Sequence, residues 1–80
     1  MIKKVVVGKD VTYIGMFSFM QCNNLAAVEF EKESTLENIG WGAFGYCGAL
    51  TEIMIPANVK EITNYAFYNC KKLTTVDFEE

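Results

Sequence analysis

The chain contains no histidine and only one proline among its 80 residues. Histidine is the commonest general base and the commonest metal ligand, so its absence argues against acid–base catalysis and against a metal centre. Long apolar runs are also missing, because the N-terminal run ends after three valines, Val5 to Val7. A secretory signal or a membrane helix needs a longer run, so we expect no signal peptide and no membrane insertion.

Positive charge is also scarce, with seven basic residues against ten acidic ones and a net charge of −3. Nucleic acid and anionic membranes bind to a broad basic face, so neither is an expected partner. A chain of this length holds one small core and has little room for the deep, water-excluding pocket of an enzyme. We therefore predict a single non-catalytic domain without a cofactor.

The most informative feature that is present is an internal repeat. The same residue types recur three times in the same order, with a spacing of 25 and then 23 residues. Such a period indicates stacked units that share one core. The array covers residues 1–80, with coils at 2–24, 25–49 and 50–72 and a partial coil at 73–80. The clearest columns are Phe19, Phe44 and Phe67, Cys22, Cys47 and Cys70, and Leu25, Leu50 and Leu73.

The residue pattern within each unit predicts a short strand followed by turns. After Leu50 the residues alternate in polarity, so that Ile53 and Ile55 share one side of a strand and Met54 takes the other. Pro56 should end that strand. A second, weaker extended segment follows, and the stretch from 65 to 70 is long enough for only one helical or 3₁₀ turn. The predicted fold is a parallel-stranded solenoid, mostly β.

The repeat resembles the BspA-like leucine-rich repeat family, whose units are about 23 residues long. The third copy carries the pattern most fully, and these residues match it: Cys47, Leu50, Ile53, Ile55, Pro56, Val59, Ile62, Ala66, Phe67 and Cys70. The resemblance implies a recognition module that binds a protein ligand or a host surface. It also implies a protein that is exposed at the cell surface or secreted. The alternative is an excised or designed repeat block whose activity is structural self-assembly.

The cysteine and phenylalanine columns have a structural interpretation. Each cysteine is alone in its unit, whereas zinc sites use four Cys or His ligands, commonly in close pairs, so no metal site is expected. Buried thiols suit the inside corner of a coil. Neighbouring coils are also close enough for a disulfide, although the odd number of cysteines leaves at least one thiol free. Both arrangements remain open at this point.

The segment from Gly40 to Gly45 has the glycine spacing of a dinucleotide-binding loop. That motif requires a long helix directly after it, whereas Gly48 follows within a few residues. The equivalent segments of the other two coils lack the glycines. We interpret this segment as a structural turn.

Two surfaces are candidates for binding. The outward strand positions form the first, with the binding residues Val6, Glu29, Thr51, Glu52, Met54 and Asp77. Glu29 and Asp77 could perform acid–base work only in a desolvated pocket, and a solvated face is the simpler interpretation. The second is an aromatic group of Trp41, Tyr46, Tyr65 and Tyr68, which either packs between coils or forms an exposed patch.

Neither end of the array has a polar capping unit, and uncapped solenoid ends favour pairing. We predict self-association as a homo-oligomer through Val5, Val7, Leu73, Val76 and Phe78.

Overall fold

The computed structural model describes residues 2–63 and 65–79. Within them the chain forms parallel strands and no helix. Four strands of four residues alternate with three strands of two residues. In chain order they are β1 Lys4–Val7, β2 Tyr13–Ile14, β3 Ala27–Phe30, β4 Asn38–Ile39, β5 Glu52–Ile55, β6 Glu61–Ile62 and β7 Thr75–Phe78.

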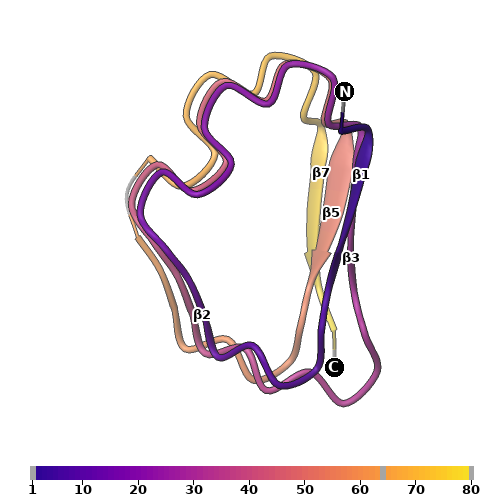
Figure 1. Cartoon of the computed structure of the whole chain (residues 1–80), viewed down its shortest axis with the longest axis vertical. Helices are drawn as coiled ribbons and strands as arrows, with labels where there is room; N and C mark the ends of the chain where they lie inside the picture. Colours follow the sequence, from indigo (N-terminus) through magenta and orange to yellow (C-terminus); the bar gives the residue numbers. More distant parts are fainter. Residues whose placement is uncertain (1, 64, 80) are drawn as a thin grey trace.

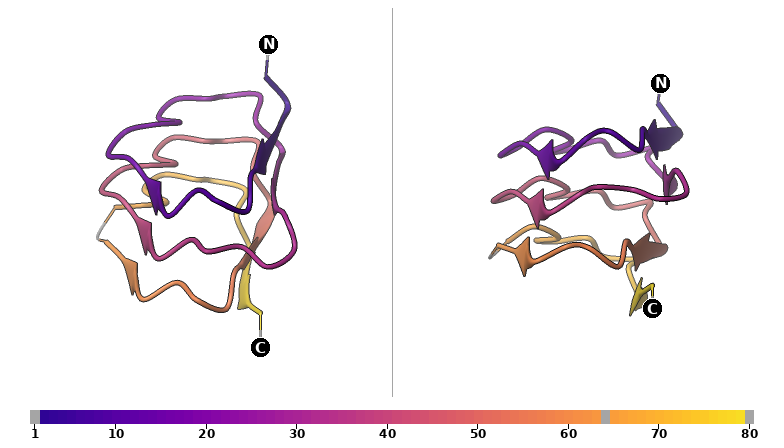
Figure 2. Two further views of the ribbon diagram at one scale, coloured as in Figure 1. Left: turned by 60° about the horizontal axis from the view of Figure 1, so that its bottom comes forward. Right: turned by 90° about the horizontal axis from the view of Figure 1, so that it is seen from below.

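The coils superpose when the molecule is viewed along the stack, with the four-residue strands on one side and the two-residue strands on another (Figure 1). Viewed from the side, the coils lie one above the next and the described chain runs from one end of the stack to the other (Figure 2). The strands pair in parallel as β1 with β3, β5 with β7, and β2 with β4 with β6. This confirms the predicted repeat solenoid.

The strand register places residues that are 23 positions apart in the sequence side by side in neighbouring coils. Val5 pairs with Val28 and Val7 with Phe30. Ile53 pairs with Val76 in the second strand pair. Because successive side chains of a strand point to opposite faces, this register directs one apolar ladder inward and a mixed set of side chains outward.

The core is a stack of apolar rings that one coil could not bury alone. The phenylalanine column lies in near-parallel contact, with ring centroids of Phe19 and Phe44 5.3 Å apart and those of Phe44 and Phe67 5.5 Å apart. Phe44 in the middle coil is fully buried. The middle coil contributes most of the largest fully buried side chains, which are Leu25, Leu36, Ile39, Phe44, Cys47, Leu50 and Ile55.

The segment between the short strand and the cysteine differs from the expected helical or 3₁₀ turn. It is a run of β-turns, in which the N–H groups of Ser18 and Cys22 donate to carbonyls three residues earlier. The N–H groups of Phe19 and Gln21 instead donate to the next coil, each at 2.8 Å. Alternate donors are therefore used between coils, and the positive φ of Gln21, 61°, interrupts any right-handed helix.

The middle coil is two residues longer than the third, because five residues, Glu31 to Thr35, link its strands where the third coil has three, residues 56–58. Most of this link is exposed, and Glu33 has a positive φ of 61°. Ser34 is buried, where its hydroxyl accepts a bond from the Leu36 N–H at 3.2 Å. The insertion is thus accommodated as a turn outside the repeating core.

Candidate binding face

The outward side chains of the four-residue strands form one continuous face. Val6 pairs with Glu29 and Met54 pairs with Asp77. Val6 is 56% exposed and Met54 51% exposed, so apolar side chains reach solvent on this face. The face combines apolar, hydroxyl and carboxylate groups on a rigid frame.

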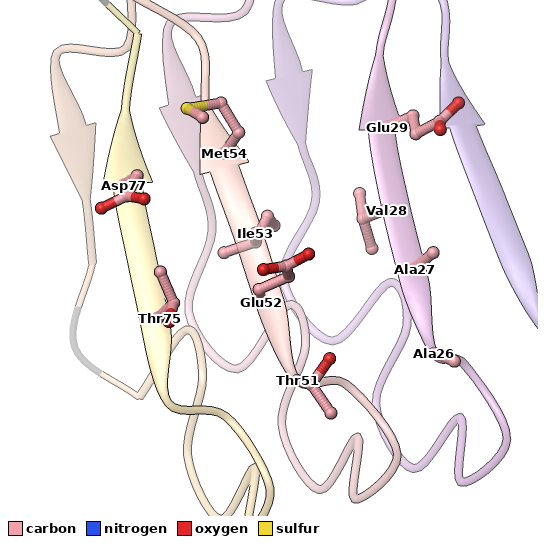
Figure 3. A pocket seen from close by; sticks show the side chains of 10 residues that line it. All are labelled: Ala26, Ala27, Val28, Glu29, Thr51, Glu52, Ile53, Met54, Thr75 and Asp77. Atoms are coloured by element: carbon pink, nitrogen blue, oxygen red, sulfur yellow. The ribbon is translucent and has the colours of Figure 1, made fainter.

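A groove of about 280 Å³ crosses this face between β3 and β5. Figure 3 shows its lining side chains on β3, β5 and β7 and on the residues that precede β3 and β5. Five of the six predicted binding residues line it, and Val6 lies outside it on β1. The lining residues are Ala26, Ala27, Val28, Glu29, Thr51, Glu52, Ile53, Met54, Thr75 and Asp77.

The groove lies where the strand ladder is interrupted. Among the described residues no backbone hydrogen bond joins β3 to β5. In the other two strand pairs, the N–H of the residue after the strand closes the ladder: Glu31 donates to the last residue of β1 at 3.0 Å and Glu79 to the last residue of β5 at 2.8 Å. Pro56 occupies this position after β5 and has no N–H, so the bond to Phe30 cannot form.

The groove is negatively charged. Glu29, Glu52 and Asp77 contribute carboxylates, and Lys4 Nζ lies 3.1 Å from Glu29 Oε1. Both partners of that pair are more than half exposed, so it adds little stability and is screened by salt. No ion pair engages Glu52 or Asp77 within residues 2–63 and 65–79.

The arrangement offers no evident catalytic chemistry. Glu29 and Asp77 lie on strands separated by β5, and both are exposed, so neither is held in the desolvated environment that acid–base catalysis requires. In the part of the chain that is described, no three His, Cys, Asp or Glu side chains are grouped to hold a metal ion. The described residues also contain no helix long and apolar enough to cross a membrane.

The three cysteines form a ladder of free thiols. The Cys47 thiol donates to the Phe19 carbonyl at 3.2 Å, and the Cys70 thiol donates to the Phe44 carbonyl at 3.0 Å. Burial raises the pKa of Cys47 to about 11, with a smaller contribution from the neighbouring Cys70 thiol. Burial also raises the pKa of Cys70. Thiols held in the protonated form are poor nucleophiles, so these two are structural.

Each glycine of the segment from Gly40 to Gly45 has a packing role. A Cβ on Gly40 would lie 2.8 Å from the Ile14 carbonyl oxygen, and Gly42 has a positive φ of 64°. A Cβ on Gly45 would lie 3.1 Å from Met20 Cε. No helix follows this segment, so it has no helix N-terminus to receive a pyrophosphate.

The residues predicted for self-association differ in exposure. Val7 is buried and Val5 and Leu73 are half-buried, since they point toward the core. Val76 and Phe78 are 39% and 60% exposed. At the first coil, a hollow of about 290 Å³ is lined mainly by apolar residues that include Val5, Val7, Val11 and Phe19.

The second candidate surface is the aromatic group. The aromatic side chains Trp41, Tyr46, Tyr65 and Tyr68 pack against one another across coils and also line a pocket of about 270 Å³. The sequence placed them near one another but could not distinguish packing from exposure. The structure shows both, because the same rings contact each other and remain 39–52% exposed.

Comparisons with known proteins agree with this geometry. A family model described as the BspA type leucine rich repeat region (6 copies) matches residues 1–80. The crystal structure of a leucine-rich repeat protein from Bacteroides capillosus is similar, with a TM-score of 0.85 and 35% sequence identity over 98% of this chain and 54% of that chain. The chain thus spans about half the length of that protein. No curated protein matches significantly. The chain belongs to the BspA type leucine-rich repeat family.

Proposed function

We propose that this chain is a non-catalytic recognition module that binds a protein partner through the groove between β3 and β5. Repeats of this family are typical of protein-interaction modules rather than enzymes. The observation that carries the proposal is the groove itself, because five residues predicted from the repeat as outward and variable in type line it together. A solenoid can vary such positions without altering its core.

The charge of the groove indicates the chemistry of the partner. Glu52 and Asp77 have no cationic partner among the described residues, and Met54 adds an exposed, adaptable apolar contact. A segment carrying lysine or arginine next to an apolar side chain complements both features. Electrostatic complementarity of this kind sets specificity and association rate more than affinity.

A fluorescent peptide of eight lysines serves as the probe, titrated against the 80-residue chain at low and at physiological salt. Glu52→Lys should weaken binding by about two- to fivefold, the effect of reversing one charge at an exposed interface. Glu37→Lys makes the same charge change away from the groove and is the matched control. Equal effects of the two variants would show that only net charge matters and would refute the groove.

Met54→Glu separates the apolar contribution from charge. Met54 is half exposed on β5, so the variant should remain folded by circular dichroism. With a probe that alternates lysine and leucine, it should lose the affinity gained from leucine while still binding the all-lysine peptide. If the variant binds both probes as the parent does, Met54 is not part of the site.

Adhesion at the cell surface is the setting we propose for this recognition, by analogy with the family resemblance. Protease treatment of intact producing cells tests it, because a surface protein is digested while a cytoplasmic marker survives. Digestion only after lysis would refute the location without affecting the groove.

Self-assembly through the ends is a second candidate. The apolar hollow at the first coil and the exposed Phe78 and Val76 at the last could continue the ladder between copies or against further coils. Light scattering coupled to chromatography should detect species larger than a monomer, and Phe78→Glu should reduce them. A monomer at all concentrations would refute self-association.

A further inference from the structure

The aromatic pocket is separate from the groove and shares no lining residue with it. It is formed by the turn segments of successive coils, with Met20 from the first, Trp41, Gly42 and Tyr46 from the second, and Tyr65 and Tyr68 from the third. Its volume is about 270 Å³. Four of its six lining residues are therefore aromatic, and none carries a charge.

The rings of the pocket differ in arrangement from those of the core. The core phenylalanines stack within 7° of parallel, so their faces are covered by one another. In the pocket, Trp41 and Tyr65 are tilted by 57°, with centroids 5.0 Å apart. Tyr68 meets Tyr65 at 78° and Tyr46 at 87°. None of these three pairs stacks face to face, in contrast to the core phenylalanines.

Gly42 keeps one wall of the pocket free of a side chain. Its φ of 64° favours glycine, and a Cβ there would lie 2.8 Å from the Phe17 ring and 3.3 Å from Met20 Cε. Phe17 in turn packs edge-on against Trp41, with centroids 5.4 Å apart. The first coil thus holds the Trp41 ring, which forms one side of the pocket, in place through Phe17.

We propose that this pocket binds a quaternary ammonium group. The face of an aromatic ring attracts a cation, and several faces around one hollow favour a cation that is bulky and weakly hydrated. A primary ammonium is strongly hydrated and needs acceptors, whereas the lining side chains offer only tyrosine hydroxyls and the weakly accepting Met20 thioether. No lining side chain is cationic, and the net charge of the chain is −3, so neither opposes a cation.

Trp41 is the chain's single tryptophan and reports directly on the pocket. Choline chloride should change its fluorescence saturably, with a dissociation constant on the order of millimolar, as expected for a few exposed cation–π contacts. Sodium chloride at equal ionic strength controls for salt. The neutral carbon analogue, 3,3-dimethyl-1-butanol, has nearly the same shape and should bind at least tenfold more weakly. Equal binding of the two would show a merely apolar pocket and overturn the proposal.

Tyr65→Leu keeps the site apolar but removes one ring, and should weaken choline binding by about three- to tenfold. Tyr13→Leu is the matched control, because Tyr13 is 53% exposed and lies outside the pocket. Circular dichroism establishes that both variants are folded. If Tyr65→Leu binds choline as tightly as Tyr13→Leu does, the pocket is not the site.

Phosphatidylcholine vesicles form a second arm that distinguishes a lipid headgroup from a soluble ligand. Sedimentation with vesicles that depends on Tyr65 assigns the headgroup, and binding of choline alone assigns a soluble ligand. The absence of Tyr65-dependent binding in both arms refutes the proposal. Neither result bears on the groove, because the two sites share no residue.

Discussion

Gly40 is the position where the close approach of two coils can be tested most directly. A Cβ at this residue would lie 2.8 Å from the Ile14 carbonyl oxygen, 2.9 Å from the Met16 nitrogen and 3.0 Å from the Gly15 carbonyl carbon. All three atoms belong to the backbone of the first coil, so no side-chain rotation can relieve the contacts. Gly40→Ala must therefore push the first and second coils apart locally.

The cost follows from what that displacement disturbs. The Gly40 N–H donates to the Ile14 carbonyl at 2.8 Å, and this bond would lengthen. Overpacking costs about 1–3 kcal/mol and a weakened hydrogen bond about 1 kcal/mol. The smaller entropy of an unfolded chain containing alanine offsets about 0.4–1 kcal/mol. We expect a net loss of about 2 kcal/mol, which in a domain of this size lowers the Tm by roughly 8–16 °C.

Gly48→Ala is the matched control, since a Cβ at Gly48 would meet no heavy atom within 4 Å. It should be neutral or stabilising by up to about 1 kcal/mol. Urea unfolding followed by circular dichroism measures both variants. If Gly40→Ala is as stable as Gly48→Ala, the coils are not in the close contact described, and the explanation of the glycine segment fails.

Three further predictions concern the core, the turns and the thiols. Phe44→Ala should lower the free energy of unfolding by about 3–5 kcal/mol, measured in urea, because the ring is fully buried between two others. Phe78 is 60% exposed, so Phe78→Ala should cost much less. Similar losses for the two variants would contradict the stacked phenylalanine ladder. Gln21→Gly should stabilise the fold by about 0.5 kcal/mol and so raise the urea midpoint, because Gln21 is exposed and has a positive φ of 61°, which strains any residue except glycine. A lower midpoint would refute that strain. The raised pKa of Cys47 means that the folded state holds the thiol proton more tightly than the unfolded state, so stability should fall as pH rises from 9 to about 11. Cys47→Ala should flatten that fall, and an unchanged pH profile would contradict the assignment.

The repeat predicted most of the architecture because a solenoid turns sequence spacing directly into spatial neighbours. Residues 25 or 23 positions apart must lie in adjacent coils, which is why the register of Val5 with Val28 and Ile53 with Val76 follows from the columns alone. The same reasoning placed the phenylalanine and cysteine ladders. No comparable rule fixes the backbone path between the ladders.

The turn segments show what the columns leave undetermined. A stretch of six residues is compatible with one helical turn or with consecutive β-turns, and the choice depends on whether its N–H groups bond within the coil or to the next one. The structure uses alternate groups for each purpose. The positive φ values of Phe17 and Tyr46 could not be predicted either, because among residue types only glycine and asparagine favour a positive φ.

The groove illustrates a different limit. Pro56 indicated the end of a strand, and it does follow β5 directly. Its further effect is on β3 in the neighbouring coil, since the missing N–H would have bonded to Phe30. Alternation identified which residues point outward, but it could not show that β3 and β5 separate beneath them. The β1–β3 and β5–β7 pairs keep a closing bond that the step from β3 to β5 lacks, and the groove opens at that step.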